Sequence, residues 1–88
     1  MRNFNFSDKL EKILFKLSRK DKQLYEQVLK KVQEVANSYE IEHYKNLKYD
    51  MKDCKRIHIG HFVLIFIYNK TNNTISFEDF DHHDEIYK

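Results

Sequence analysis

Histidine and arginine side chains that could do acid–base chemistry stand at two places in the second half of this 88-residue chain. Arg56 and His58 are two residues apart in an alternating segment and should point the same way, and His82 and His83 are adjacent. Imidazole titrates near neutral pH and can take or give a proton, whereas guanidinium binds phosphate oxygens. These residue types could transfer protons and bind an anionic group such as a phosphate. A simpler interpretation, solvated polar residues on an exposed strand face, stays open.

Lysines interspersed with aromatic residues precede this segment: Lys45, Lys48, Lys52 and Lys55, with Tyr44 and Tyr49. Charge attraction combined with base stacking is typical of proteins that bind single-stranded RNA. Residues 1–56 carry fourteen Lys and Arg against nine Asp and Glu, whereas residues 57–88 carry two against five. The charge asymmetry favours a polyanion-facing surface built from the first part of the chain, or lysines that merely solvate two helices. The four lysines predict an RNA contact, with a solvated loop as the alternative.

The first half of the chain has the pattern of one short strand and two helices. Residues 3–6 alternate polar and aromatic side chains, as a strand would. Ser7 is an N-cap residue, and the apolar spacing after it predicts a helix that ends near Ser18. Ser18 and Asp21 have the form of a capping box, which would open a second helix running to about Asn37. The two helices should form an antiparallel hairpin.

The second half has the pattern of a loop followed by three strands. Residues 38–53 show no clean period and are predicted to be a surface loop. Strands are predicted at 54–59, at 62–68, which is apolar on both faces and so central, and at 74–80, with a hairpin loop at 69–73. The expected fold is therefore α+β, with the helical hairpin packed on one face of a twisted, mainly antiparallel four-stranded sheet.

Nothing in the sequence divides the chain, so we expect one compact domain over residues 1–88. Cys54 is the only cysteine, which excludes an internal disulfide and favours a reducing, cytoplasmic location. The longest apolar run, residues 62–68, is too short to span a bilayer, and Met1–Asp8 lacks the apolar core of a targeting signal. The sequence thus indicates no membrane association.

Three local motifs carry a family resemblance. Lys45-Asn-Leu-Lys48 resembles a basic L-K-G segment, and Lys55 to Phe66 resembles the strand–turn–strand Y-R-I-R-V-G-D-Y-R-V-I-Y. Asp81 to Tyr87 resembles the C-terminal H-R-x-x-V-Y. With the predicted order of elements, the whole chain resembles the RelE/YoeB/YafQ-type toxins of type II toxin–antitoxin systems, in the RelE/ParE superfamily.

The resemblance implies a ribosome-dependent endoribonuclease, or mRNA interferase, that inhibits translation. In such an enzyme the 2′-hydroxyl attacks the adjacent phosphate, and neither a metal nor another cofactor is needed. The implied partners are the ribosome, messenger RNA and a cognate antitoxin laid across the helical pair or the sheet. The residues that would carry this function are, as proton-transfer groups, His58, His82 and His83; as phosphate ligands, Arg56 and Lys48; for base stacking, Tyr87; and for RNA contact, Lys45, Lys48, Lys52 and Lys55.

The sequence departs from the family pattern at several positions. His58 stands where many relatives have the second arginine of R-I-R-V-G, Val63 replaces the arginine of D-Y-R, and His83 replaces the basic residue of H-R. Tyr49 stands in place of the glycine of L-K-G. Three alternatives therefore stay open: a homologue that binds an antitoxin but cleaves RNA weakly or not at all, an RNA-binding module without catalysis, and a metal-binding module built on the histidines.

Overall fold

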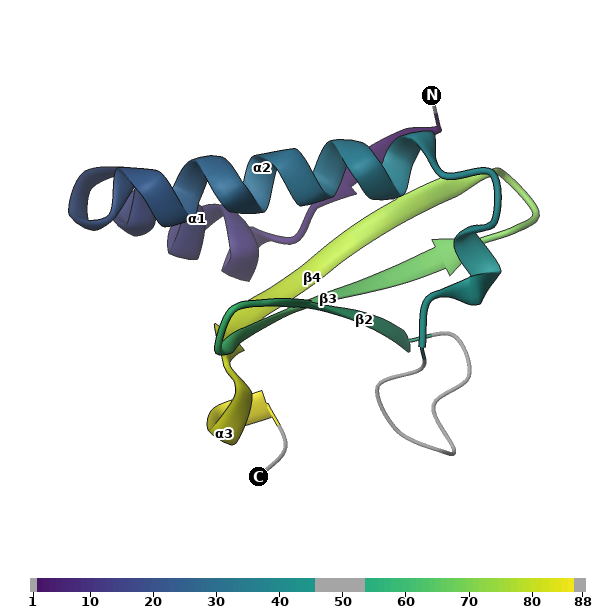
Figure 1. Cartoon of the computed structure of the whole chain (residues 1–88). Coiled ribbons are helices and arrows are strands. Elements are labelled where there is room, and N and C mark those ends of the chain that lie inside the picture. Colours follow the sequence, from purple (N-terminus) through teal and green to yellow (C-terminus); the bar gives the residue numbers. More distant parts are fainter. Residues whose placement is uncertain (1, 46–53, 87–88) are drawn as a thin grey trace.

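The structure, a computed structural model, describes residues 2–45 and 54–86. Its elements in chain order are β1 (Asn3–Phe6), α1 (Asp8–Lys20), α2 (Lys22–Asn37), the 3-10 turn η1 (Ile41–His43), β2 (Cys54–Ile59), β3 (Phe62–Asn69), β4 (Thr74–His82) and α3 (His83–Ile86) (Figure 1). The predicted α+β class and the order of strands and long helices are confirmed. The short helix α3 is an addition that the sequence pattern did not indicate.

The helix boundaries follow from their caps. Ser7 Oγ accepts the amide of Leu10 at 3.0 Å, as predicted for the start of α1. The predicted capping box is wrong: Ser18 lies inside α1 and donates its hydroxyl to the carbonyl of Phe15 at 2.7 Å, so α1 continues to Lys20. Asp21 caps α2 instead, since its Oδ1 accepts the amide of Leu24 at 3.1 Å.

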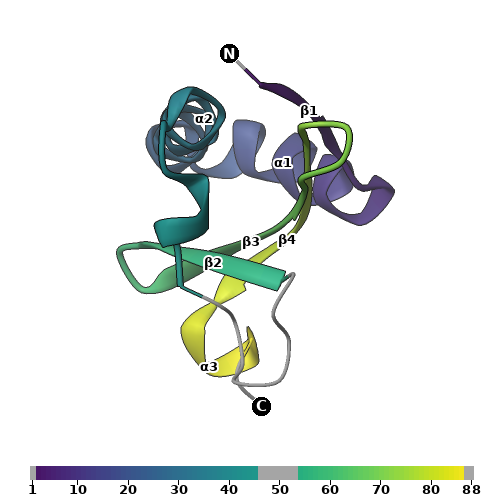
Figure 2. The ribbon, with the colours of Figure 1, turned by 90° about the vertical axis from the view of Figure 1, so that its right-hand side faces the viewer.

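The four strands form one sheet in the order β1-β4-β3-β2. β1 pairs with β4 in parallel, and the other two pairings are antiparallel, so the sheet is mainly antiparallel as predicted. Helices α1 and α2 cover one face, and α3 lies on the opposite face (Figures 1 and 2). Gly60 has a φ of 61° in the two-residue turn between β2 and β3, the conformation that a type II′ turn requires at its first central position.

A β-bulge in β4 changes which residues face the helices. Ile65 pairs with Asp79 and Phe66 pairs with Phe77, which leaves Glu78 as an extra residue in β4. Phe77 and Phe80 therefore both enter the core although they are three residues apart. The predicted end of the strand at Phe80 is wrong, because β4 restarts its alternation at the bulge and continues through His82.

The core fills the space between the helical pair and the sheet. Its buried members are Leu10, Leu14, Val28, Val32, Val35, Ala36, Ile41, Ile59, Leu64, Phe66, Ile75, Phe77 and Phe80. Ile41 is only 2% exposed, because η1 directs its side chain into the core. The prediction that residues 38–53 form a surface loop is therefore wrong at Ile41. Residues 46–53 of that loop lie outside the described residues. Within the described parts of the chain, no helix is long and apolar enough to cross a membrane.

Candidate active site

Strand β2 presents Arg56 and His58 on the face of the sheet opposite the two long helices. Their partners in β3 are Ile65 and Val63. Both partners are buried, but neither belongs to the core cluster between helices and sheet, so they lie on its other face. The carbonyl of Lys45 accepts the amide of Arg56 at 2.9 Å, which holds Lys45 alongside the outer edge of β2.

His83 reaches the same face from the other end of the sequence. Its ring stacks on that of His58, with 5.6 Å between the ring centroids and 27° between the planes. His83 is the first residue of α3, and its amide donates to the carbonyl of His61 at 2.8 Å. The side chain of His83 stays half exposed, so the stacked imidazoles are open to a substrate.

The charges around His58 favour its neutral form. Loss of part of its hydration lowers the pKa of His58, and the charges of Arg56, His83 and Lys45 lower it further. We call these four residues the His58 site: Lys45, Arg56, His58 and His83. A neutral imidazole beside a second imidazole and two cations can take a proton from a hydroxyl while the cations bind a phosphate.

His82 lies apart from the His58 site although it adjoins His83 in sequence. Its ring stacks on His61 at 6.2 Å, with 16° between the planes, and meets Phe62 edge-on at 5.6 Å. The last strand residue and the first helix residue thus face different neighbours. The stack between His61 and His82 could not be predicted from the sequence, since a turn histidine gives no local signal that it will meet a residue twenty-one positions later.

Of the other predicted RNA contacts, the structure describes only Lys55, and it does not join the His58 site. Lys55 points the other way from Arg56 and donates its Nζ to the carbonyls of Glu42 at 3.5 Å and Tyr44 at 3.2 Å. The remaining predicted residues, Lys48, Lys52 and Tyr87, lie outside the described part of the chain. Among residues 2–45 and 54–86, no group of three or more His, Cys, Asp or Glu side chains comes together to hold a metal ion.

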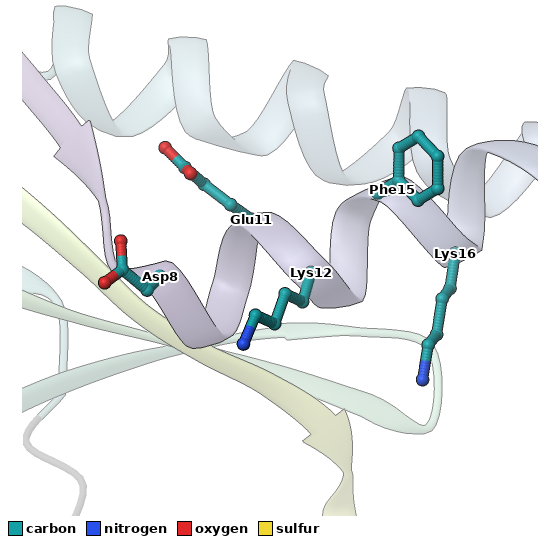
Figure 3. Close-up of a pocket in the computed structure, with 5 residues that line it drawn as sticks. All are labelled: Asp8, Glu11, Lys12, Phe15 and Lys16. Carbon is teal, nitrogen blue, oxygen red and sulfur yellow. The ribbon is translucent and has the colours of Figure 1, made fainter.

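A separate hollow runs along the outer side of α1 (Figure 3). Its lining residues are Asp8, Glu11, Lys12, Phe15 and Lys16. Phe15 is 61% exposed, and the guanidinium of Arg19 lies 4.8 Å from the centre of its ring. The hollow thus combines an exposed aromatic ring with charged side chains of both signs.

Comparison with known proteins identifies sequence relatives over nearly the whole chain. A family model described as the ParE toxin of type II toxin–antitoxin systems, parDE, matches residues 4–87. A Methanocaldococcus jannaschii protein named "Putative toxin RelE4" is 49% identical over 80 residues, which make up 90% of this chain and 83% of that protein. An uncharacterised protein of Methanosarcina mazei is 42% identical over 73 residues, 82% of this chain and 83% of that protein.

Two solved structures share the fold. The isolated RelE toxin of Escherichia coli superimposes with a TM-score of 0.74 at 22% identity, covering 93% of this chain and 84% of that one. A chain of the RelBE2 toxin–antitoxin complex of Mycobacterium tuberculosis superimposes with a TM-score of 0.59 at 18% identity, covering 92% and 96%.

Proposed function

The chain belongs to the RelE/ParE family of toxins of type II toxin–antitoxin systems, and we propose that it cleaves messenger RNA on the ribosome with the His58 site. The observation that carries this proposal is the stacking of His58 on His83 beside Arg56. Both imidazoles lie on one exposed face and come from distant parts of the sequence. Cleavage of message would stop translation, and it would place the protein's work in the cytoplasm.

The proposed reaction is attack of a ribose 2′-oxygen on the adjacent phosphorus. His58 takes the 2′-hydroxyl proton, since its lowered pKa keeps the ring neutral and ready to act as a base. His83 gives a proton to the departing 5′-oxygen, and Arg56 and Lys45 stabilise the charge that builds on the phosphate. The bond to the 5′-oxygen breaks as the 2′-oxygen bond forms, which leaves a 2′,3′-cyclic phosphate and a 5′-hydroxyl. No step uses a metal.

The direct test adds the purified protein to translating ribosomes that carry a defined message and maps the new 5′ ends with and without EDTA. Cuts that persist in EDTA and leave cyclic phosphates would support the proposal. A folded protein that makes no cuts but binds an antitoxin would instead be a catalytically inactive homologue. Salt-sensitive binding to free RNA without cleavage on ribosomes would identify an RNA-binding module.

The proposed base role predicts a pH dependence. The pKa of His58 is lowered from its ordinary value of 6.5, so protonation of His58 requires a more acidic solution. The acidic limb of the pH–rate profile should therefore have its midpoint below pH 6.5, and the whole profile should be bell-shaped because the proposed reaction also needs an acid that still carries its proton. NMR titration of the His58 ring should give the same midpoint without RNA, and Arg56→Gln should move it upward because a neighbouring positive charge is lost. A midpoint above 6.5 would contradict the base assignment.

A partner protein is the second part of the proposal. One solved structure that shares the fold comes from a toxin–antitoxin complex, and we propose that an antitoxin segment docks on the α1 hollow of this chain. Phe15 offers an exposed ring at the hollow, and the guanidinium of Arg19 lies 4.8 Å from the centre of that ring. Lys12 and Lys16 line the hollow together with Asp8 and Glu11. An amphipathic segment that places an apolar side chain on Phe15 and carboxylates beside the cations would match this surface.

Phe15→Ala should weaken antitoxin binding by roughly 30-fold, because removal of a central aromatic contact typically costs about 2 kcal/mol of binding free energy. Isothermal titration of the purified toxin with its antitoxin measures the effect. Tyr39→Ala is the matched control, since Tyr39 is 99% exposed and does not line the α1 hollow. Equal affinities for both variants and the wild type would exclude α1 as the main docking surface.

A further inference from the structure

We infer that His82 and His61 are positioning residues that hold His83 against His58. This inference rests on the proposed function, in which His83 is the catalytic partner of His58. His82 then positions His83 and does not carry out the proton transfer that the family resemblance implies for it. His61, a turn residue, also acts as a positioning residue. We call the two residues the histidine clasp, because they join the end of β4 to the turn between β2 and β3.

The clasp is a stack of rings at the end of the sheet. His82 lies 6.2 Å from His61 with nearly parallel planes, and Phe62 meets His82 edge-on at 5.6 Å. Phe62 in turn stacks on Phe80 at 5.1 Å, and Phe80 belongs to the buried core. Phe62 therefore links the ring of His82 to the buried ring of Phe80. Aromatic contacts of this kind restrict the orientation of the His82 ring.

His82 also begins α3 through a hydrogen bond. Its Nδ1 accepts the amide of Asp84 at 3.3 Å, the bond that an N-cap side chain makes to the second residue of a helix. The preceding amide, that of His83, donates to the carbonyl of His61 at 2.8 Å. The two members of the clasp thus accept two consecutive amides, those of His83 and Asp84.

This anchoring matters because α3 has only four residues. A helix this short does not form by itself in water, since the first turn fixes several backbone angles for a single hydrogen bond. The place of the His83 ring must then come from tertiary contacts. The stack and the cap of His82 and the carbonyl of His61 supply them, and they fix the ring 5.6 Å from that of His58.

The geometry also separates His82 from the reacting face. Phe80 faces the helices, and two residues further along β4 His82 lies on that same side, next to Phe62. His83 leaves the strand and lies on the opposite side with His58. Nδ1 of His82 is directed at Asp84, whose amide it accepts at 3.3 Å and whose Oδ2 lies 3.7 Å away.

Three variants of His82 test the clasp. His82→Ala removes both the stack and the cap, His82→Phe keeps a ring that can stack, and His82→Asn keeps a side chain that can cap. We expect His82→Ala to lower the hydrogen-exchange protection of the His83 amide and the cleavage rate, each on the order of tenfold. His82→Phe or His82→Asn should recover a large part of both, although neither side chain transfers protons at neutral pH.

Two results would overturn the inference. One is unchanged protection of the His83 amide in His82→Ala; the other is a variant that regains protection but not cleavage, which would make His82 a proton-transfer group. His43→Ala is the control, because His43 is exposed in η1 and pairs with Glu40 away from the clasp. Amide exchange is measured without RNA. If the wild-type protein cleaves nothing, the proposed function fails, while loss of protection in His82→Ala still supports the clasp.

Discussion

Replacement of His58 by alanine should lower the rate of message cleavage by roughly 10²- to 10⁴-fold, the usual loss when a general base is removed. In the proposed reaction Arg56 and Lys45 stabilise the phosphate charge and His83 serves the leaving group, whereas His58 is the residue whose lowered pKa suits it to accept the 2′-hydroxyl proton. Its ring is exposed, so the truncation should leave the folding stability within about 0.5 kcal/mol of the wild type.

The measurement is a time course of cleavage on ribosomes stalled at one codon, with enzyme in excess so that chemistry rather than turnover is observed. His43→Ala is the matched control, because it removes an exposed imidazole that pairs with Glu40 and does not belong to the His58 site. A His58→Ala protein that unfolds like the wild type and cleaves within about threefold of it would rule out His58 as the base.

Replacement of Phe66 by alanine should have the largest effect on stability, about 3–5 kcal/mol of the free energy of unfolding. Phe66 is fully buried in the central strand β3. Its ring lies 5.5 Å from that of Tyr44 and 5.7 Å from that of Phe77, so its removal opens a cavity between η1 and the sheet. A domain of this size has only about 5–15 kcal/mol of stability in total.

Urea unfolding followed by circular dichroism would measure this loss. Phe15→Ala is the control with the same chemical change on the surface, and it should alter stability by less than about 0.5 kcal/mol. A loss below about 1 kcal/mol for Phe66→Ala would mean that the ring does not pack as the structure shows.

The elements of this fold could be predicted from sequence because their signals are local. The helical spacing after Ser7 and the apolar run of β3 each lie within a dozen residues, and the structure confirms both elements. The capping box failed for a local reason as well. A serine near a helix end can bond the carbonyl three residues earlier as easily as it can cap the next helix, and Ser18 does the former.

The candidate site could be predicted only in part, because its geometry depends on strand register. Alternation alone placed Arg56 and His58 on one face. The stacking of His83 on His58, however, depends on where β4 pairs with β3. That register depends on the extra residue Glu78, which no period reveals. The separation of His82 from His83 and the stack of His82 on His61 follow from pairing between distant segments, whereas Lys55 faces away from Arg56 because successive strand residues alternate.

The parallel pairing of β1 with β4 also constrains when the protein can become complete during synthesis. Ser7 caps α1 and donates its hydroxyl to the carbonyl of Glu78, 71 residues later in the chain. At about 5–20 residues per second, β1 must wait roughly 4–14 seconds for its partner strand to be made. Until then Phe4 and Phe6 have no strand to pack against, although α1 and α2 can already pair through local contacts. The nascent chain would therefore pass through a helical intermediate in which β4, and with it the stack of His83 on His58, does not yet exist.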